Sequence, residues 1–146
     1  MPFQAVFSVV NSVALLCWIA LVFLPRWPAL RTAIQVVVVG GLCTLYAVLI
    51  AVYFFRVDGG GFFSLAAVQR LFESPPVALA GWVHYLAFDL FVGLWIARRS
   101  DAIGLSRWLQ APILAVTFMF GPIGLLLFSV IDRAGRLNAV APMRMQ

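Results

Sequence analysis

Charged side chains are scarce in this sequence, and lysine is missing altogether. Of the 146 residues only 10% are charged, against 64% that are hydrophobic, and the mean hydropathy is +1.06. A soluble domain is about half apolar and about a quarter charged. The shortage of charge therefore excludes an ordinary soluble domain and indicates an integral membrane protein.

Cysteine and histidine are also rare, which limits metal and disulfide chemistry. Cys17 and Cys43 each lie inside an apolar run, where a small, soft side chain packs well. The sequence has no CxxC pair and no Cys/His cluster, and His84 is its single histidine. It therefore predicts no disulfide framework, no metal site and no bound cofactor.

The basic residues are all arginines, and all lie outside the apolar runs. A formal net charge of +5 could suggest a nucleic-acid-binding protein. Arginines that flank apolar segments instead contact anionic lipid headgroups, so we expect membrane lipids and not nucleic acid as partners. In a four-span arrangement the arginines divide equally between the two sides and leave the orientation open. Arg26 and Arg31, after an uncharged N-terminal flank, favour an N-terminus on the outside.

Four apolar windows are long enough to cross a bilayer, which takes about 20 helical residues. They lie at about 5–24, 32–55, 77–97 and 110–131. The first lacks the basic start and the exit site of a secretory signal, so we interpret it as a span. The predicted fold class is all-α: a polytopic membrane protein whose four helices form one bundle within residues 1–131.

The longest connection between windows is predicted to hold a short helix of its own. Ser64 suits an N-cap, and the run 65–73 places apolar side chains on one side and polar ones on the other. This pattern predicts an amphipathic helix on the membrane surface, which is either a lid or a simple anchor. Residues 132–146 form a polar C-terminal tail, which we expect to fray.

The fourth window is interrupted by Gly121 and Pro122. Pro122 has no N–H, so the carbonyl of Phe118 loses its helical partner. Within a bilayer that carbonyl must be satisfied by another helix, a side chain or water. The sequence therefore predicts a kink here, with a partner for Phe118 from elsewhere.

The third window carries two ionisable side chains at membrane depth, His84 and Asp89. Such residues are rare in spanning helices and are functional candidates by default. Helical geometry separates them by roughly 140° around the axis and roughly 7.5 Å along it, so they do not form a direct pair. We expect both to border one intramembrane pocket and to act as catalytic acid and base.

The remaining residues of the third window divide by type. Its aliphatic face, which includes Val83, Leu86 and Leu90, is suited to lipid tails. Polar side chains on other windows supply further candidates. The predicted substrate-binding residues are Trp82, Tyr85, Phe88, Trp95, Asn11 and Thr117.

Each polar residue also has a structural explanation. Tyrosine, tryptophan or arginine donors could hold Asp89, and His84 could bind a backbone carbonyl to fix helix packing. For Asn11 and Gln35, an interhelical hydrogen bond is the favoured role. The sequence alone leaves these alternatives open.

Two long motifs resemble the signature of a known family. They are WVHYLAFDLFVGLWI at 82–96, with Asp101 shortly after, and TFMFGPIGLLL at 117–127. Together with a Pro-Trp-Arg turn at 25–31, they are similar to the neoxanthin synthase-like family, defined by abscisic-acid-deficient plants. The sequence departs from plant members by Leu94, where those tend to have a basic residue. It shows no N-terminal transit extension, so we expect a bacterial member in the inner membrane.

The resemblance implies a carotenoid or related isoprenoid as substrate. Plant members are implicated in forming neoxanthin from violaxanthin, an isomerisation that opens an epoxide and leaves an allene. This chemistry needs one proton removed beside the polyene and one delivered to the epoxide oxygen, a task that His84 and Asp89 could divide. The aromatic residues around them would hold the polyene.

Three functions remain possible at this point. The first is a cofactor-free isomerase. The second is a non-catalytic membrane subunit that binds a carotenoid, a chlorophyll-type pigment or haem, with His84 as axial ligand. A transporter half ranks lowest, because no inverted repeat is evident. A homo-oligomer or a larger membrane complex is compatible with all three.

Overall fold

The computed structural model describes residues 2–140 of the chain, and the side chains of residues 3–135. The described residues form helices and short connections, without strands. Helix α1 (Pro2–Phe23) is followed by a tight turn and by α2 (Pro28–Ala33). A π-helical segment, Ile34–Val39, joins α2 to α3 (Gly40–Tyr53) without a break.

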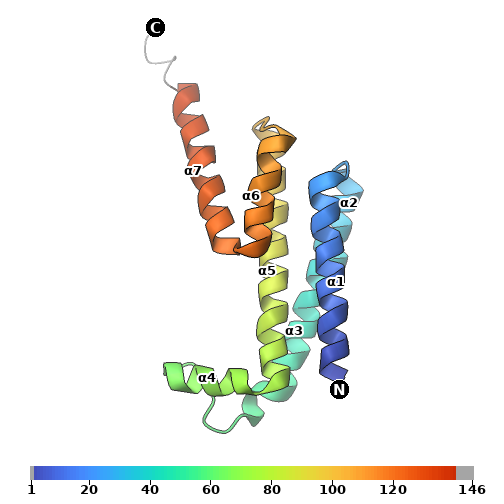
Figure 1. Cartoon of the computed structure of the whole chain (residues 1–146), viewed down its shortest axis with the longest axis vertical. Helices are drawn as coiled ribbons and strands as arrows, with labels where there is room; N and C mark the ends of the chain where they lie inside the picture. Colours follow the sequence, from blue (N-terminus) through green and yellow to red (C-terminus); the bar gives the residue numbers. More distant parts are fainter. Residues whose placement is uncertain (1, 141–146) are drawn as a thin grey trace.

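The second half of the chain adds the long central helix and three others around it. Helix α4 (Leu65–Glu73) lies across the end of α5 (Pro75–Ala102), as Figure 1 shows. Helices α6 (Arg107–Met119) and α7 (Gly121–Val140) follow. Helix α5 contacts α1, α3, α4, α6 and α7, so it is the axis of the fold.

Three helical segments are long and apolar enough to cross a membrane: Phe3–Phe23, Pro28–Arg56 and Pro75–Ala102. They correspond to the first three predicted windows, each extended by a few residues. The all-α class and the apolar spans are confirmed. These helices indicate that the chain is an integral membrane protein.

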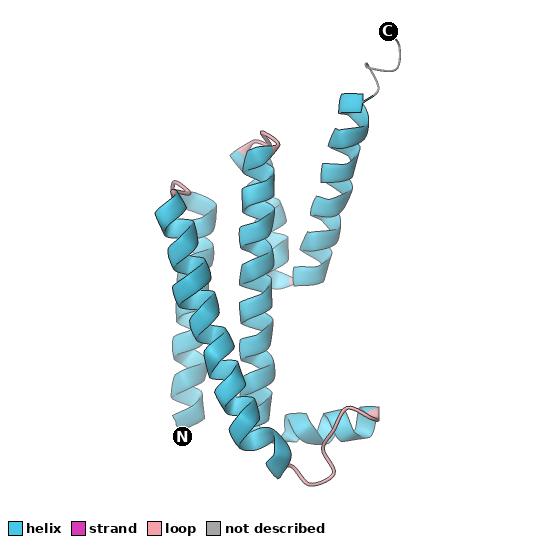
Figure 2. Ribbon diagram, turned by 180° about the vertical axis from the view of Figure 1, so that it is seen from behind, coloured by secondary structure: helices cyan, strands magenta, loops and turns pink. Residues whose placement is uncertain are grey.

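The prediction of one continuous fourth span at about 110–131 is wrong. The residues divide into α6 and α7, and Figures 1 and 2 show α7 running back toward the end of the molecule where α6 begins. The chain turns at Phe120, whose backbone leaves the helical region, and Gly121 and Pro122 then start α7. The predicted kink is thus a reversal, because Pro122 is suited to a first helical turn and not to a helix interior.

An ion pair fixes the middle of the returning helix. The Arg99 side chain on α5 donates to Asp132 on α7 at 3.0 Å, and Asp132 is buried. Helix α7 continues to Val140, so the first part of the predicted polar tail, which starts at residue 132, is helical. The remainder of that tail, residues 141–146, lies outside the described residues.

The aliphatic face of α5 packs inside the bundle and not against lipid. Val83 and Leu90 are fully buried, and Leu86 is 5% exposed, in contact with residues of α1 and α3. The expectation that this face meets lipid tails is wrong. Aliphatic side chains interdigitate closely between helices, whereas the bulkier aromatic residues of α5 remain at the surface.

Helix α4 has the predicted bounds. The Ser64 hydroxyl accepts a hydrogen bond from the backbone N–H of Ala67 at 3.1 Å, so the predicted N-cap is confirmed. Leu71 is buried, while Gln69 and Arg70 are exposed. The helix is amphipathic, and its place on a membrane surface stays a prediction.

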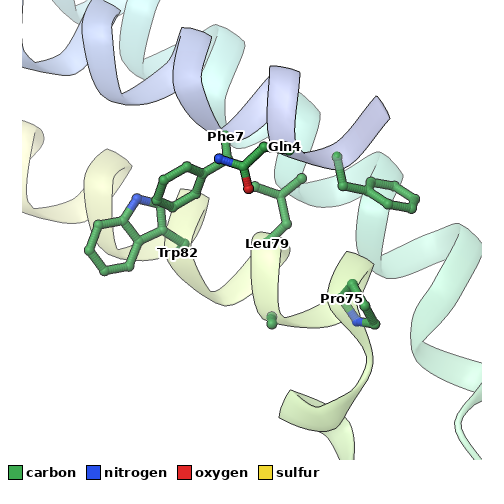
Figure 3. A pocket seen from close by; sticks show the side chains of 7 residues that line it. Gln4, Phe7, Pro75, Leu79 and Trp82 are labelled. Carbon is green, nitrogen blue, oxygen red and sulfur yellow. The ribbon is translucent and has the colours of Figure 1, made fainter. Parts of the chain in front are cut away.

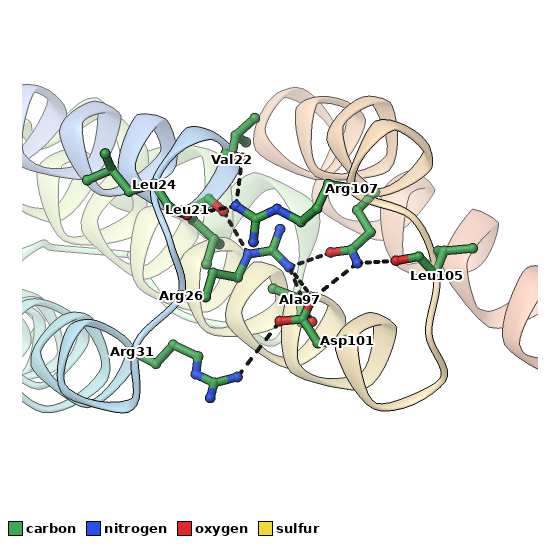
Figure 4. A network of polar contacts seen from close by, with 10 residues as sticks. Leu21, Val22, Leu24, Arg26, Arg31, Ala97, Asp101, Leu105 and Arg107 are labelled. Carbon is green, nitrogen blue, oxygen red and sulfur yellow. Dashed lines mark hydrogen bonds and ion pairs between the residues drawn. The ribbon is translucent and has the colours of Figure 1, made fainter.

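A buried guanidinium, drawn in Figure 4, joins three helices at the end of the molecule opposite α4 (Figure 1). The side chain of Arg26, only 3% exposed, donates to Leu21 on α1, to Asp101 on α5 and to Gln110 on α6. Gln110 in turn donates to Asp101 at 3.1 Å. Burial lowers the pKa of Arg26, and the neighbouring Asp101 opposes that shift.

The reversal at Phe120 changes how the arginines are distributed. With α7 returning, its arginines lie at the same end of the molecule as the α1–α2 turn. Among the residues with described side chains, this end carries Arg26, Arg31, Arg98, Arg99, Arg107 and Arg133. The α4 end carries Arg56 and Arg70. Arginine-rich segments stay in the cytoplasm, so this asymmetry favours one orientation.

We predict that the N-terminus lies outside and that the end of α7 lies in the cytoplasm. Reporter domains fused before α1 and after the full chain should then report opposite sides of the membrane. A four-span bundle would instead place both reporters on one side. Moving the second reporter to the loop before α6 is the control, and it should report the cytoplasm as well.

Candidate functional site

His84 on α5 lies within a group of rings. Its imidazole stacks on Phe88, one helical turn further, with ring centroids 4.5 Å apart. The ring of Tyr46 on α3 lies 5.3 Å away. Ring contacts therefore hold the imidazole from two helices, and the structure gives it a defined position.

A pocket of about 220 Å³ opens beside His84, between α3, α4 and α5. Its wall is aromatic and aliphatic, and the imidazole of His84 is part of it. Gly81 leaves room for Phe72 of α4, since a Cβ at this glycine would collide with that ring. The lining consists of Tyr46, Ile50, Phe54, Phe62, Leu71, Phe72, Val77, Gly81 and His84.

Asp89 lies elsewhere, against the turn between α6 and α7. It is 8% exposed, and its Oδ2 atom is buried without a hydrogen-bond partner. A Cβ added to Gly121 would collide with the carboxylate. Only glycine lets the α6–α7 turn approach α5 this closely.

Tyr85 holds the same turn. Its hydroxyl lies 3.1 Å from the carbonyl oxygen of Phe118 and 3.2 Å from that of Met119. The N–H that would serve Phe118 is missing at Pro122, and the N–H of Ile123 binds Phe120 instead of Met119. The predicted need for an outside partner is confirmed, and a side chain of α5 supplies it.

Trp82 connects α5 to α1. Its indole N–H donates to the side-chain oxygen of Asn11 at 3.0 Å, so the interhelical role favoured for Asn11 is confirmed. Trp82 also lines a second pocket, of about 390 Å³, between α1 and the start of α5. Figure 3 shows Trp82, Phe7 and Gln4 around it. The roles of Trp82 and Asn11 toward a substrate stay predictions.

The other predicted site residues do not gather with His84, apart from Phe88. Trp95 packs edge-on against Phe128 of α7 at 5.5 Å, toward the arginine-rich end. Thr117 is buried, and its hydroxyl donates to the carbonyl of Ile113. It lies so close to Gly124 of α7 that a Cβ there would collide with it. Both contacts serve helix packing.

The structure does not bring His84 and Asp89 to one pocket. His84 faces α3 and α4, whereas Asp89 faces the α6–α7 turn. The expectation of a shared cavity is wrong, because α5 is covered by different helices on its two sides. The catalytic roles of both residues stay predictions.

Sequence reasoning missed several residues of the His84 pocket. Tyr46 was recognisable only as a polar residue in an apolar window, and Phe62 and Phe72 as parts of a connection and a surface helix. Their approach depends on α4 folding back across α5, and local sequence does not encode that contact. Among residues 2–140, no three His, Cys, Asp or Glu side chains lie close enough to hold a metal ion.

The apolar helices and the buried polar residues between them define an integral membrane protein with a helical bundle. The chain belongs to the ABA4-like family (ABA DEFICIENT 4-like), whose model matches residues 5–128. The match covers α1 to α6 and the first turns of α7, so it includes both motifs. The family suggests a membrane protein related to neoxanthin synthase. No curated protein and no solved structure matches the chain.

We predict that Tyr85→Phe lowers the free energy of unfolding by about 1 kcal/mol, because two carbonyls at membrane depth lose their donor. Thermal unfolding of the purified protein in detergent measures this. Tyr53→Phe removes the same hydroxyl at the end of α3 and is the matched control. Equal effects from the two variants would contradict the role of Tyr85.

We also predict that Gly121→Ala destabilises the protein through Asp89. The new methyl group at position 121 collides with the Asp89 carboxylate and displaces it. In an Asp89→Ala background the carboxylate is gone, so Gly121→Ala should cost less stability there. A double-mutant cycle measures this coupling. Gly135→Ala, where an added Cβ meets nothing within 4 Å, is the control on the same helix. Additive effects of Gly121→Ala and Asp89→Ala would show that the two do not touch.

Proposed function

We propose that this protein is a multi-pass membrane enzyme that isomerises a carotenoid or related isoprenoid. The observation that carries the proposal is an exposed histidine on the wall of an aromatic pocket between α3, α4 and α5. Membership of the ABA4-like family supports the substrate class. A bacterial inner membrane remains the proposed location.

The pocket suits one end of a long apolar molecule. At about 220 Å³ it is smaller than the roughly 300–1,000 Å³ of a site that encloses a whole ligand. A ring at the end of a polyene could enter it while the rest of the chain stays among lipid tails. The aromatic side chains of Tyr46, Phe54 and Phe72 would contact the ring and the first double bonds.

His84 is proposed to transfer the proton. Isomerisation of an epoxide to an allene removes a proton from the polyene, breaks one C–O bond and adds a proton to the oxygen. Substrate and product have the same composition, so no co-reactant is needed. Neutral imidazole accepts the first proton, and the imidazolium that forms can deliver it to the oxygen.

Asp89 has a different proposed part. It lies on the other side of α5 and does not line the pocket, so we assign it a positioning role through the α6–α7 turn. Asp89→Asn preserves the shape of the side chain. We therefore expect it to retain part of the activity, in contrast to the loss on changing His84.

We predict that His84→Phe abolishes conversion, because it keeps the ring packing on Phe88 but cannot transfer a proton. General acid–base catalysis contributes roughly 10²–10⁴-fold, so the product should fall below detection. The assay expresses the full chain in a host that makes epoxidised carotenoids and compares pigments with and without the gene. Val48→Ala, an exposed change elsewhere on α3, is the control and should leave conversion intact.

Two results would overturn the proposal. One is parental conversion by His84→Phe at equal protein abundance. The other is a purified protein that carries a visible chromophore lost in His84→Phe and leaves the pigments of the host unchanged, which would favour the pigment-binding or haem-binding subunit.

A further inference from the structure

An apolar groove runs between α1 and α6, away from the His84 pocket of the proposed reaction. It has a volume of about 390 Å³ and is lined only by apolar side chains. From α1 these include Leu15, Ile19 and Val22, and from α6 Ala111, Ala115 and Phe118. Trp18, which is buried, also contributes to its wall.

The groove has the length of one lipid leaflet. Its α1 side extends from Leu15 to Phe23, which is about 12 Å at 1.5 Å per residue. Half of a hydrocarbon core of about 30 Å is about 15 Å. One end of the groove therefore lies near the arginine-rich end of the molecule and the other near mid-membrane.

Arg107 stands at the head of this groove. It lies one helical turn before Ala111 on α6, and its guanidinium crosses to α1, where Nη2 donates to the carbonyls of Val22 and Leu24 at 3.2 and 2.7 Å. The side chain is exposed. Figure 4 shows it beside Arg26 and the carbonyls at the end of α1.

Positive charge is in excess at this point. Arg26, Arg31 and Arg107 lie around a single carboxylate, that of Asp101, so three positive charges and one negative charge leave +2. Arg26 and Arg107 repel each other. Arg31 contacts Asp101 at only 3.8 Å. A phosphate near Arg107 would reduce the repulsion, and Arg107 has N–H groups beyond the one that binds α1.

We propose that this groove is a binding site for an anionic phospholipid, with one acyl chain between α1 and α6 and the phosphate at Arg107. The apolar lining alone would accept any hydrocarbon, but the charge at its head selects an anionic headgroup. Basic pockets between helices at the cytoplasmic surface bind such headgroups. The orientation favoured by the arginines places the groove in that leaflet.

The test is thermal unfolding of the full-length protein in detergent with added lipid. We expect phosphatidylglycerol to raise the melting temperature and phosphatidylcholine of the same chain length not to do so. Inorganic phosphate should have no effect, because it lacks the acyl chain. Equal stabilisation by both lipids, or by phosphate alone, would overturn the proposal.

The contribution of the arginine at the head of the site is tested by one variant. Arg107→Gln should weaken the retention of phosphatidylglycerol roughly tenfold or more in native mass spectrometry, the loss expected for one charge-assisted contact. Arg70→Gln on α4 is the matched control and should retain the lipid. Since Arg107 also binds α1, its loss could unfold the protein.

Ala115→Phe tests the groove without touching the arginines. Ala115 is exposed, so the larger ring fills the groove and should displace the acyl chain. Val130→Phe adds a ring to an exposed position on α7, outside the groove, and should keep the lipid-dependent stabilisation. Unchanged lipid retention in Ala115→Phe would overturn the assignment of the site.

Discussion

The fold depends on how the carbonyls of Phe118 and Met119 are satisfied. Proline at 122 removes one helical donor, and the turn redirects another, so two acceptors are left where water is scarce. The Tyr85 hydroxyl lies within reach of both and thereby joins the turn to α5. Once the turn is held there, α7 must run back along the bundle, and Asp132 then reaches Arg99. The reversal sets the side on which the C-terminal arginines lie.

Residue patterns predict the helices of this protein well but not their paths. The length of the apolar runs predicts the three spans, and Ser64 predicts the start of α4. Pro122 predicts the break and the carbonyl that loses its helical donor. A proline after glycine fits a kinked span and a reversal equally well. The difference is decided by Tyr85 and Asp89, which lie some thirty residues earlier on another helix. Contacts between distant segments of that kind have no local signature.

The sequence also misassigns the two faces of α5, for a physical reason. In water an aliphatic face turns inward and a polar face outward, but in a bilayer both surroundings are apolar. Packing density then decides, and Val83, Leu90 and Leu94 fit closely between α1 and α3. The aromatic residues Phe88, Phe91 and Trp95 lie on other sides of α5 and are each about half exposed. Hydrophobicity alone cannot make that distinction.

The separation of His84 from Asp89 follows from the same packing. Helix α5 contacts α1, α3, α4, α6 and α7, so residues about 140° apart on it meet different helices. His84 meets α3 and α4, which leave a pocket because Gly81 admits Phe72 there. Asp89 meets a turn that glycine brings so close that a Cβ at Gly121 would collide with the carboxylate. An ionisable group beside a cavity can reach a ligand, whereas one sealed against backbone acts first on the structure. The proposed function therefore assigns contact with the substrate to His84 and a positioning role to Asp89.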